Sequence, residues 1–391
     1  MSTAIKTGRR RLHFSCGALF IVGAAHVAWL GDTTTRAAEP FGIVFSGSSP
    51  EISKIKADMR QLLIAMGWTT NQVQVVDAPK GDSVSYVLSS GTPDAGTFDL
   101  AKRPELALTP ETVPYVDRLG QKKTMTLASK KEILATMLGR GRRFEFSGPN
   151  GSVDQLKEHI AIRQNVVYWG FRAGWIFPEH RAYQYDTAEH WEPMLDDDWT
   201  VKSGVKPSQA IADAFVGKSS YIIGCTSACR FVFAHGIFDY FQHVKPNPSV
   251  MAGLEASLDR RRPFVGMAPK KSPDGPPPND GLLLARHVHV PWNHWVPGDW
   301  GWIKNTDPIS SDEFGSEGSN IIYAGGGIFV NYYHNHQKKN LDQLLKRVYG
   351  WRLGLEESEL DLEAATMDLL RKDPRDGGML RDVRDFSRIF H

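Results

Sequence analysis

Short apolar runs alternate with stretches of helical periodicity between residues 41 and 171, and this alternation constrains the fold more than any other feature. Residues 41–45 form an apolar run, and apolar side chains recur at helical spacing over residues 52–63, which predicts a strand and then a helix. The same patterns predict a strand at 73–76, a helix at 131–138, a strand at 142–146, a helix at 152–162 and a buried strand at 166–171. Such alternation predicts an α/β fold with a mostly parallel sheet covered by helices. The polar, Thr/Pro/Gly-rich residues 80–130 are predicted to be a surface insertion.

The composition is that of a folded, soluble protein. Of the 391 residues, 41% are hydrophobic and 23% are charged, which excludes a disordered chain or a coiled coil. At roughly 150 residues per domain, this length favours two domains or one large domain. The 46 basic residues are nearly balanced by 44 acidic ones, so we expect no nucleic-acid partner, because such binding needs clustered positive charge. Three cysteines are too few for a disulfide scaffold.

The N-terminus has the layout of an export signal. Basic side chains between positions 6 and 11 precede an apolar run over residues 14–30, and Ala37 follows as a small residue at a cleavage position. We therefore predict that residues 1–37 direct the chain to the periplasm or the extracellular space. An uncleaved N-terminal anchor is the alternative, and we expect no other membrane-spanning segment.

Three segments of the N-terminal half resemble the caspase-like cysteine peptidases, including the legumain type. They are Gly-Ile-Val-Phe-Ser-Gly at 42–47, Phe-Ser-Gly-Pro-Asn at 146–150 and Val-Val-Tyr-Trp-Gly-Phe at 166–171. In that family the last strand ends in a His-Gly pair that supplies the catalytic base, whereas this chain has Ala173 and Gly174. The resemblance implies a caspase-like parallel-sheet domain over residues 38–198 that lacks its catalytic histidine.

Cys225 is the strongest candidate for a nucleophile. Pro207 opens a predicted helix over residues 207–215, and a long, largely apolar helix is predicted to begin at Cys225 itself. A cysteine in the first turn of a helix lies near the positive end of the helix dipole, which lowers the pKa of the thiol. A buried structural cysteine remains the alternative. Cys229, one turn later, is predicted to be a packing residue.

Four ordered blocks of the C-terminal half resemble the Bacillus spore-coat transglutaminases, the protein-glutamine gamma-glutamyltransferases. They lie at 204–214 together with 224–228, at 294–305 (His-x-x-x-Gly-Asp, later Lys-Asn), at 320–325 and at 341–351, where the resemblance implies the family's closing helix. The resemblance implies a papain-like catalytic domain over residues 199–354, followed by a charged helical tail over 355–391. It also implies acyl transfer through a Cys225 thioester between protein glutamine and lysine side chains, with no cofactor and no metal.

The sequence departs from that family at the two partners of the cysteine. Ser319 stands where the family has its catalytic glutamate, and Tyr332 stands where it has its histidine. Glu317 and His334 lie two residues away, and residues i and i+2 of a strand share a face. If Ser319 pairs with Tyr332 across a hairpin, Glu317 faces His334. Either the hairpin slides and restores a Cys–His–Glu set with Cys225, or the site is inactive.

Two further groups of side chains have alternative interpretations. Trp300 and Trp302 belong to a tryptophan cluster that either lines a groove for a substrate chain or packs beneath the hairpin. His287, His289 and His294 follow the spacing of the first metal motif of cupins. The chain has no second cupin motif, so we predict no metal site.

These observations leave three functions open. The first is an exported transglutaminase with Cys225 as its nucleophile. The second is a caspase-like peptidase or amidase, in which water replaces the amine. The third is a pseudoenzyme that binds protein partners, which the residues at positions 173, 319 and 332 favour.

Overall fold

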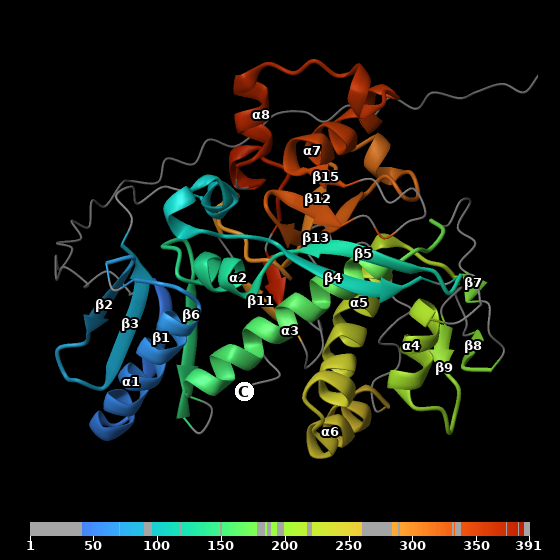
Figure 1. Cartoon of the computed structure of the whole chain (residues 1–391). Coiled ribbons are helices and arrows are strands. Elements are labelled where there is room, and N and C mark those ends of the chain that lie inside the picture. The colour runs from blue at the N-terminus through green and yellow to red at the C-terminus, as the bar shows by residue number, and fades with distance from the viewer. Residues whose placement is uncertain are drawn as a thin grey trace, which may run out of the picture. The chain divides into compact units, whose positions relative to one another are not determined.

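The computed structural model of the protein has a mixed α/β fold (Figure 1). The structure describes residues 41–69, 71–89, 96–117, 119–148, 151–177, 184–185, 189–193, 199–216, 221–259, 284–287, 290–330, 332, 338–372, 374–381 and 383–386. The predicted export signal lies outside these ranges, and Pro40–His391 forms one compact unit. No helix within the described ranges is long and apolar enough to cross a membrane.

Most of the predicted helices are present. The helices are α1 (Ser49–Ala65), α2 (Lys130–Met137), α3 (Val153–Arg172), α4 (Pro207–Val216), α5 (Cys225–Asp239), α6 (Pro248–Asp259), α7 (Leu341–Gly350) and α8 (Ala364–Leu370). The predictions at 52–63, 131–138, 207–215 and 341–351 are thus confirmed, as is the start of a helix at Cys225.

The strands form two larger sheets and three small two-stranded ones. They are β1 (Gly42–Ser46), β2 (Val73–Asp77), β3 (Ser83–Leu88), β4 (Glu111–Val116), β5 (Lys122–Leu127), β6 (Arg143–Ser147), β7 (Gln184–Tyr185), β8 (Trp191–Pro193), β9 (Trp199–Val201), β10 (Tyr221–Ile222), β11 (Ala285–His287), β12 (Trp300–Lys304), β13 (Gly318–Gly325), β14 (Ile328–Val330), β15 (Lys339–Asn340) and β16 (Val383–Asp385).

The N-terminal sheet has the order β2-β3-β1-β6. The alternation predicted a mostly parallel sheet, and this prediction is wrong. Only β1 and β6 pair in parallel, while β3 is antiparallel to both β1 and β2. β3 lies within residues 80–130, predicted to be a surface insertion, yet five of its six residues are buried. The polar residues around β3 led to the prediction of a surface insertion, although β3 lies between two other strands of the sheet. The caspase-like domain is not confirmed.

The strand predicted at residues 166–171 is wrong, because α3 runs without a break from Val153 to Arg172. Val166 and Val167 favour a strand by propensity. Instead both are buried in the hydrophobic cluster around α5, and a short apolar run does not distinguish a buried strand from a buried helix. Gly236 of α5 permits this packing, because a Cβ there would lie 2.9 Å from the Cα atom of Val166.

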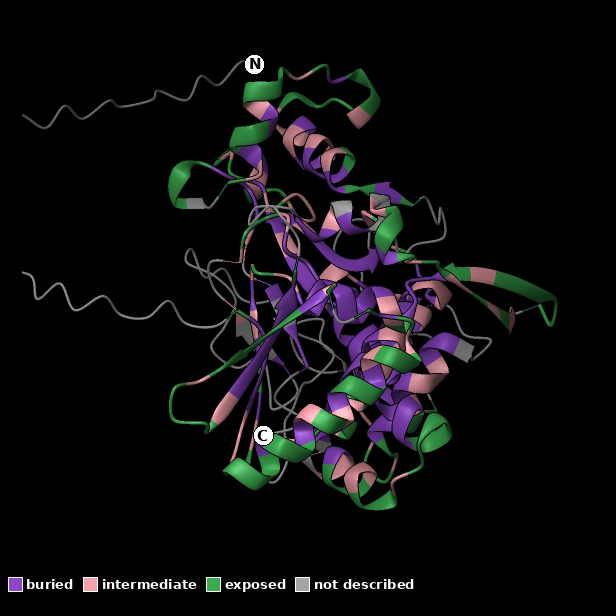
Figure 2. Ribbon diagram, turned by 60° about the vertical axis from the view of Figure 1, so that its left-hand side comes forward, coloured by how far each residue is buried: buried purple, intermediate pink, exposed green. Residues whose placement is uncertain are grey.

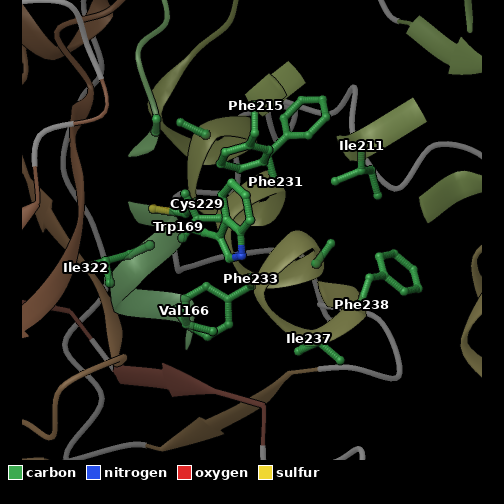
Figure 3. Packing of buried hydrophobic residues seen from close by; sticks show 14 of the residues in the cluster. Val166, Trp169, Ile211, Phe215, Cys229, Phe231, Phe233, Ile237, Phe238 and Ile322 are labelled. Carbon is green, nitrogen blue, oxygen red and sulfur yellow. The ribbon is translucent and has the colours of Figure 1, made fainter. Parts of the chain in front are cut away.

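The largest hydrophobic cluster surrounds α5, every residue of which from Ser227 to Phe238 is buried. It combines side chains of α3, α4, α5, β13 and β14 (Figure 3). The buried positions in Figure 2 gather where these elements meet. Residues on both sides of the domain boundary predicted at residues 198 and 199 belong to this cluster, so that boundary does not coincide with a gap in the core.

The C-terminal sheet has the order β11-β16-β12-β13-β14-β15. One face packs against the helix predicted at 341–351, where Leu341, Leu344, Leu345 and Val348 form a buried stripe at helical spacing. The tail after residue 354 docks on the same cluster through α8 and adds β16 to the sheet.

A buried ion network joins α3 to the turn before β12. Arg163 of α3 donates to Asp299 (Nη1–Oδ1 2.9 Å) and to Asp385 (Nη2–Oδ2 2.7 Å). Arg142 binds the same two carboxylates, at 2.6 and 3.0 Å. Gly298 brings the turn close, because its φ is +87° and a Cβ there would lie 3.1 Å from the carbonyl oxygen of Arg163. Asp299 is the aspartate of the His-x-x-x-Gly-Asp block, so this block has a structural role in the protein.

Candidate active site at Cys225

Cys225 is the first residue of α5 and directly follows the N-cap residue Gly224. The backbone N–H groups of the first turn of a helix have no partners within the helix, and the positive end of the dipole lies there. The residue is half-buried and its thiol is free. The structure therefore places Cys225 where the sequence predicted it.

An amide from the neighbouring sheet contacts the sulfur. Nδ2 of Asn320, on β13, lies 3.2 Å from Sγ of Cys225 and 2.9 Å from Oγ1 of Thr226. The oxygen at the other end of the amide is also hydrogen-bonded, because Nε1 of Trp300 donates to Oδ1 of Asn320 at 2.9 Å. The sequence analysis did not identify Asn320 or Thr226 as site residues.

The pKa of the Cys225 thiol is raised above its ordinary value, and not lowered as the helix position predicted. Burial of the sulfur is the main cause, because the thiolate loses its hydration. Hydrogen bonds from the side chain and the backbone of Asn320 act in the opposite direction, and the negative charge of Glu317 adds to the rise. At neutral pH the resting thiol is therefore protonated.

The hairpin register differs from the predicted one by one residue. Ile322 pairs with Val330, and a β-bulge next to the glycine turn shifts the strands. The predicted pairing of Ser319 with Tyr332 would instead place Ile321 opposite Val330. The hydroxyl of Tyr332 donates to the backbone oxygen of Asn320 at 3.1 Å. A shift of one residue exchanges the two faces of a strand.

The face of β13 that meets α5 carries Asn320, whose amide contacts Cys225 and Thr226. The neighbouring Ser319 lies on the other face, because successive residues of a strand alternate. Glu317 is exposed, and its carboxylate accepts a hydrogen bond from the backbone of Gly315 at 2.9 Å. Its charge acts on Cys225, but no acidic or basic side chain of the described residues is hydrogen-bonded to the sulfur. His334 lies outside the described residues, so a catalytic role for the pair remains a prediction.

Tyr332, at the position of the family's histidine, is a packing residue. It is 3% exposed, and its hydroxyl lies 2.9 Å from Sγ of Cys229. Cys229 is fully buried and belongs to the cluster around α5, in which Figure 3 labels it together with Trp169 and Ile322. The predicted packing role of Cys229 agrees with this environment.

The two tryptophans of β12 lie at different depths. Trp300 is 2% exposed, so it offers almost no surface to a substrate chain, and its role at the site is to hold Asn320. Trp302 pairs with Asn320 in the ladder and is half-buried. Directly paired residues of an antiparallel ladder share a face, so Trp302 lies on the face that carries Asn320. A substrate-binding role for Trp302 remains a prediction.

The histidines with cupin-like spacing do not converge where they are described. Nε2 of His287 pairs with Asp385 at 3.1 Å, and the ring of His294 packs against Gly141. His289 lies outside the described residues. Within the described part of the chain, no group of three or more His, Cys, Asp or Glu side chains is arranged to hold a metal ion.

A free thiol at a helix N-terminus, contacted by an amide donor, is a site of the kind that thiol acyltransferases use. Residues 114–252, which include Cys225, match the family model of protein-glutamine gamma-glutamyltransferase. This match confirms the transglutaminase resemblance and indicates an enzyme of that type, an acyltransferase.

A solved structure also resembles the chain. It is the transglutaminase from Geobacillus stearothermophilus without its C-terminal extension, with 20% sequence identity and a TM-score of 0.36. The similarity covers 50% of this chain and 84% of that one. No curated protein sequence matches the chain. The family match begins at residue 114, well before the catalytic domain predicted to start at residue 199.

Proposed function

We propose that the protein is an exported protein-glutamine gamma-glutamyltransferase with Cys225 as its nucleophile. The observation that carries the proposal is the free, half-buried thiol at the start of α5, within the stretch that matches the family. Its substrates are glutamine and lysine side chains of other proteins. Export rests on residues 1–37, and a shortened N-terminus in protein recovered from the periplasm or the medium is expected.

The reaction has two halves. The Cys225 thiol gives up its proton, and the thiolate attacks the carboxamide carbon of a glutamine. The C–N bond breaks as the leaving nitrogen takes up that proton and departs as ammonia. A lysine amine then attacks the thioester carbon, and the C–S bond breaks with its electron pair on sulfur. The proton that the amine loses returns to the sulfur, and an isopeptide bond remains. Backbone N–H groups at the start of α5 are suited to stabilise the oxyanion in both halves. Neither half requires a metal or an organic cofactor.

The test uses the full chain, a glutamine-containing acceptor protein and a fluorescent primary amine. We expect covalent labelling that disappears in Cys225→Ala and persists in Cys229→Ala, the matched control on the same helix. Labelling that survives Cys225→Ala contradicts the proposal. Ammonia release without amine incorporation indicates the hydrolytic alternative.

A second candidate is a pseudoenzyme that binds protein partners. Ser319 and Tyr332 at the positions of the family's partner residues favour it, as does the raised pKa of the Cys225 thiol. This candidate predicts a native protein that incorporates no amine, although it is folded, and whose Cys225 does not react with iodoacetamide even at alkaline pH.

A further inference from the structure

The side-chain amide of Asn320 can have only one orientation in this structure. The indole nitrogen of Trp300 carries a hydrogen and has no free lone pair, so it can donate but not accept. Because it lies 2.9 Å from one end of the amide, that end is the oxygen. The amide's NH₂ group must then face the sulfur of Cys225.

The NH₂ group has two hydrogens, and two acceptors lie in front of it. One is Oγ1 of Thr226 at 2.9 Å, and the other is Sγ of Cys225 at 3.2 Å. In this arrangement the sulfur accepts and does not donate. A thiolate is a far better acceptor than a thiol, and hydrogen bonds to charged groups are the stronger ones. The contact therefore favours the ionised sulfur.

We propose that Asn320 stabilises the thiolate of Cys225, and that Trp300 fixes the amide orientation this requires. This inference rests on the proposed function for its place in the reaction. The thiolate is the attacking species in the first half and the leaving group when the C–S bond breaks in the second. Asn320 donates to the sulfur at both points, whereas Trp300 acts only through Asn320 and is a positioning residue.

Among the described residues, no other side chain around the sulfur supplies this stabilisation, although the backbone of Asn320 and of Cys225 also favours the ionised sulfur. Glu317 is the charged side chain that acts on it, and its negative charge opposes ionisation. Tyr332 and Cys229 bind one another one helical turn away. Among the described side chains, the donor to the sulfur is thus a neutral amide. The residue before it in the strand, Ser319, lacks the family's carboxylate.

The experiment measures how fast iodoacetamide alkylates Cys225 of the folded full chain as pH rises, with each modified cysteine identified by fragment mass spectrometry. Asn320→Ala removes the donor and should move the midpoint upward by about one pH unit, which lowers the rate at pH 7.5 about tenfold. Trp300→Phe keeps the packing of the ring but frees the amide to turn, and should give a smaller shift in the same direction.

Asn165→Ala is the matched control. The Asn165 amide donates to α5 at Gly236 (2.7 Å) and at Asp239 (3.0 Å), away from the thiol, so the midpoint should not move. An unchanged midpoint in Asn320→Ala, or equal shifts in all three variants, overturns the inference. If Asn320→Ala does not fold, Trp300→Phe decides, and an unchanged midpoint there overturns it. Alkylation is read without catalysis, so failure of this test is distinct from labelling that survives Cys225→Ala.

Discussion

Arg163 and Asp299, 136 residues apart in the sequence, form an ion pair in which both side chains are fully buried. The backbone on either side of this aspartate also binds β13, because Gly298 donates to the carbonyl oxygen of Tyr323 at 2.8 Å and Asp299 accepts from its N–H at 2.9 Å. The pair therefore holds α3 against the two strands that carry Asn320 and Trp300.

Asp299→Ala should strongly destabilise the protein. It leaves the guanidinium groups of Arg163 and Arg142 with one shared carboxylate, that of Asp385, in a buried site. Removing one partner of a buried pair lowers the free energy of unfolding by about 3–5 kcal/mol. Urea denaturation measures this loss. Asp58→Ala, which breaks the surface pair with Lys54, should cost under about 1 kcal/mol. Similar losses in both variants would contradict the structural role of the network.

Gly298→Ala should destabilise the protein more than Gly204→Ala. The two glycines have similar φ angles, +87° and +83°, but the space around Gly204 is open, whereas a Cβ at Gly298 meets the backbone of Arg163. Gly204→Ala therefore measures the backbone strain alone, about 1 kcal/mol. The further loss of stability in Gly298→Ala, about 1–3 kcal/mol, measures the cost of forcing the turn at residue 298 away from the backbone of α3. Equal melting temperatures of the two variants would argue against it.

Glu132→Gln should stabilise the protein increasingly as pH rises. Glu132 is 4% exposed, and burial raises the pKa of its carboxyl group, although the N–H of Gly326 donates to it at 2.7 Å. A carboxyl group whose pKa is raised in the folded state holds its proton longer than in the unfolded state. Stability is therefore lost as pH rises from about 4.5 through the folded-state pKa.

Glutamine keeps the acceptor for Gly326 and cannot ionise. The difference in melting temperature between Glu132→Gln and the parent should thus be larger at pH 8 than at pH 4. Glu145→Gln, at an exposed position of β6, serves as the control. A difference that is constant with pH would show that Glu132 does not titrate across this window.

Glu317→Gln should speed alkylation of Cys225 at neutral pH. The charge of Glu317 contributes to the raised pKa of this thiol, and its removal enlarges the thiolate fraction. Since that charge is exposed, we expect a gain of about twofold at low salt, which salt should reduce. A slower reaction in Glu317→Gln would instead favour the assisting role predicted for this residue.

The sequence predicted the starts of helices well and the pairing of strands poorly. Pro207 and Cys225 mark helix starts through local chemistry that requires no tertiary partner. The length of α3 and the burial of β3 depend on neighbours far along the chain, and propensity alone gave the wrong result for Val166 and Val167. The family match supports the class of enzyme indicated by the four ordered blocks.

The candidate site was predictable only at its cysteine. The bulge in the glycine turn moves the register of β13 by one residue, and nothing in the local sequence indicates that shift. Independently of that pairing, the side chain of β13 next to Cys225 is that of Asn320 and not of Ser319. The apolar alternation of Ile322 and Ala324, which share the face of Asn320, was the available signal.

Because α3 and α5 pack in one hydrophobic cluster, the chain cannot be truncated between them without exposing that cluster. A fragment that begins at residue 199 would lose the α3 side chains that cover α5. It would also lose Arg142 and Arg163, the two arginines that bind the buried carboxylates of Asp299 and Asp385. Such a fragment should collect in inclusion bodies, whereas a chain that begins at Phe41 retains every described partner of the thiol.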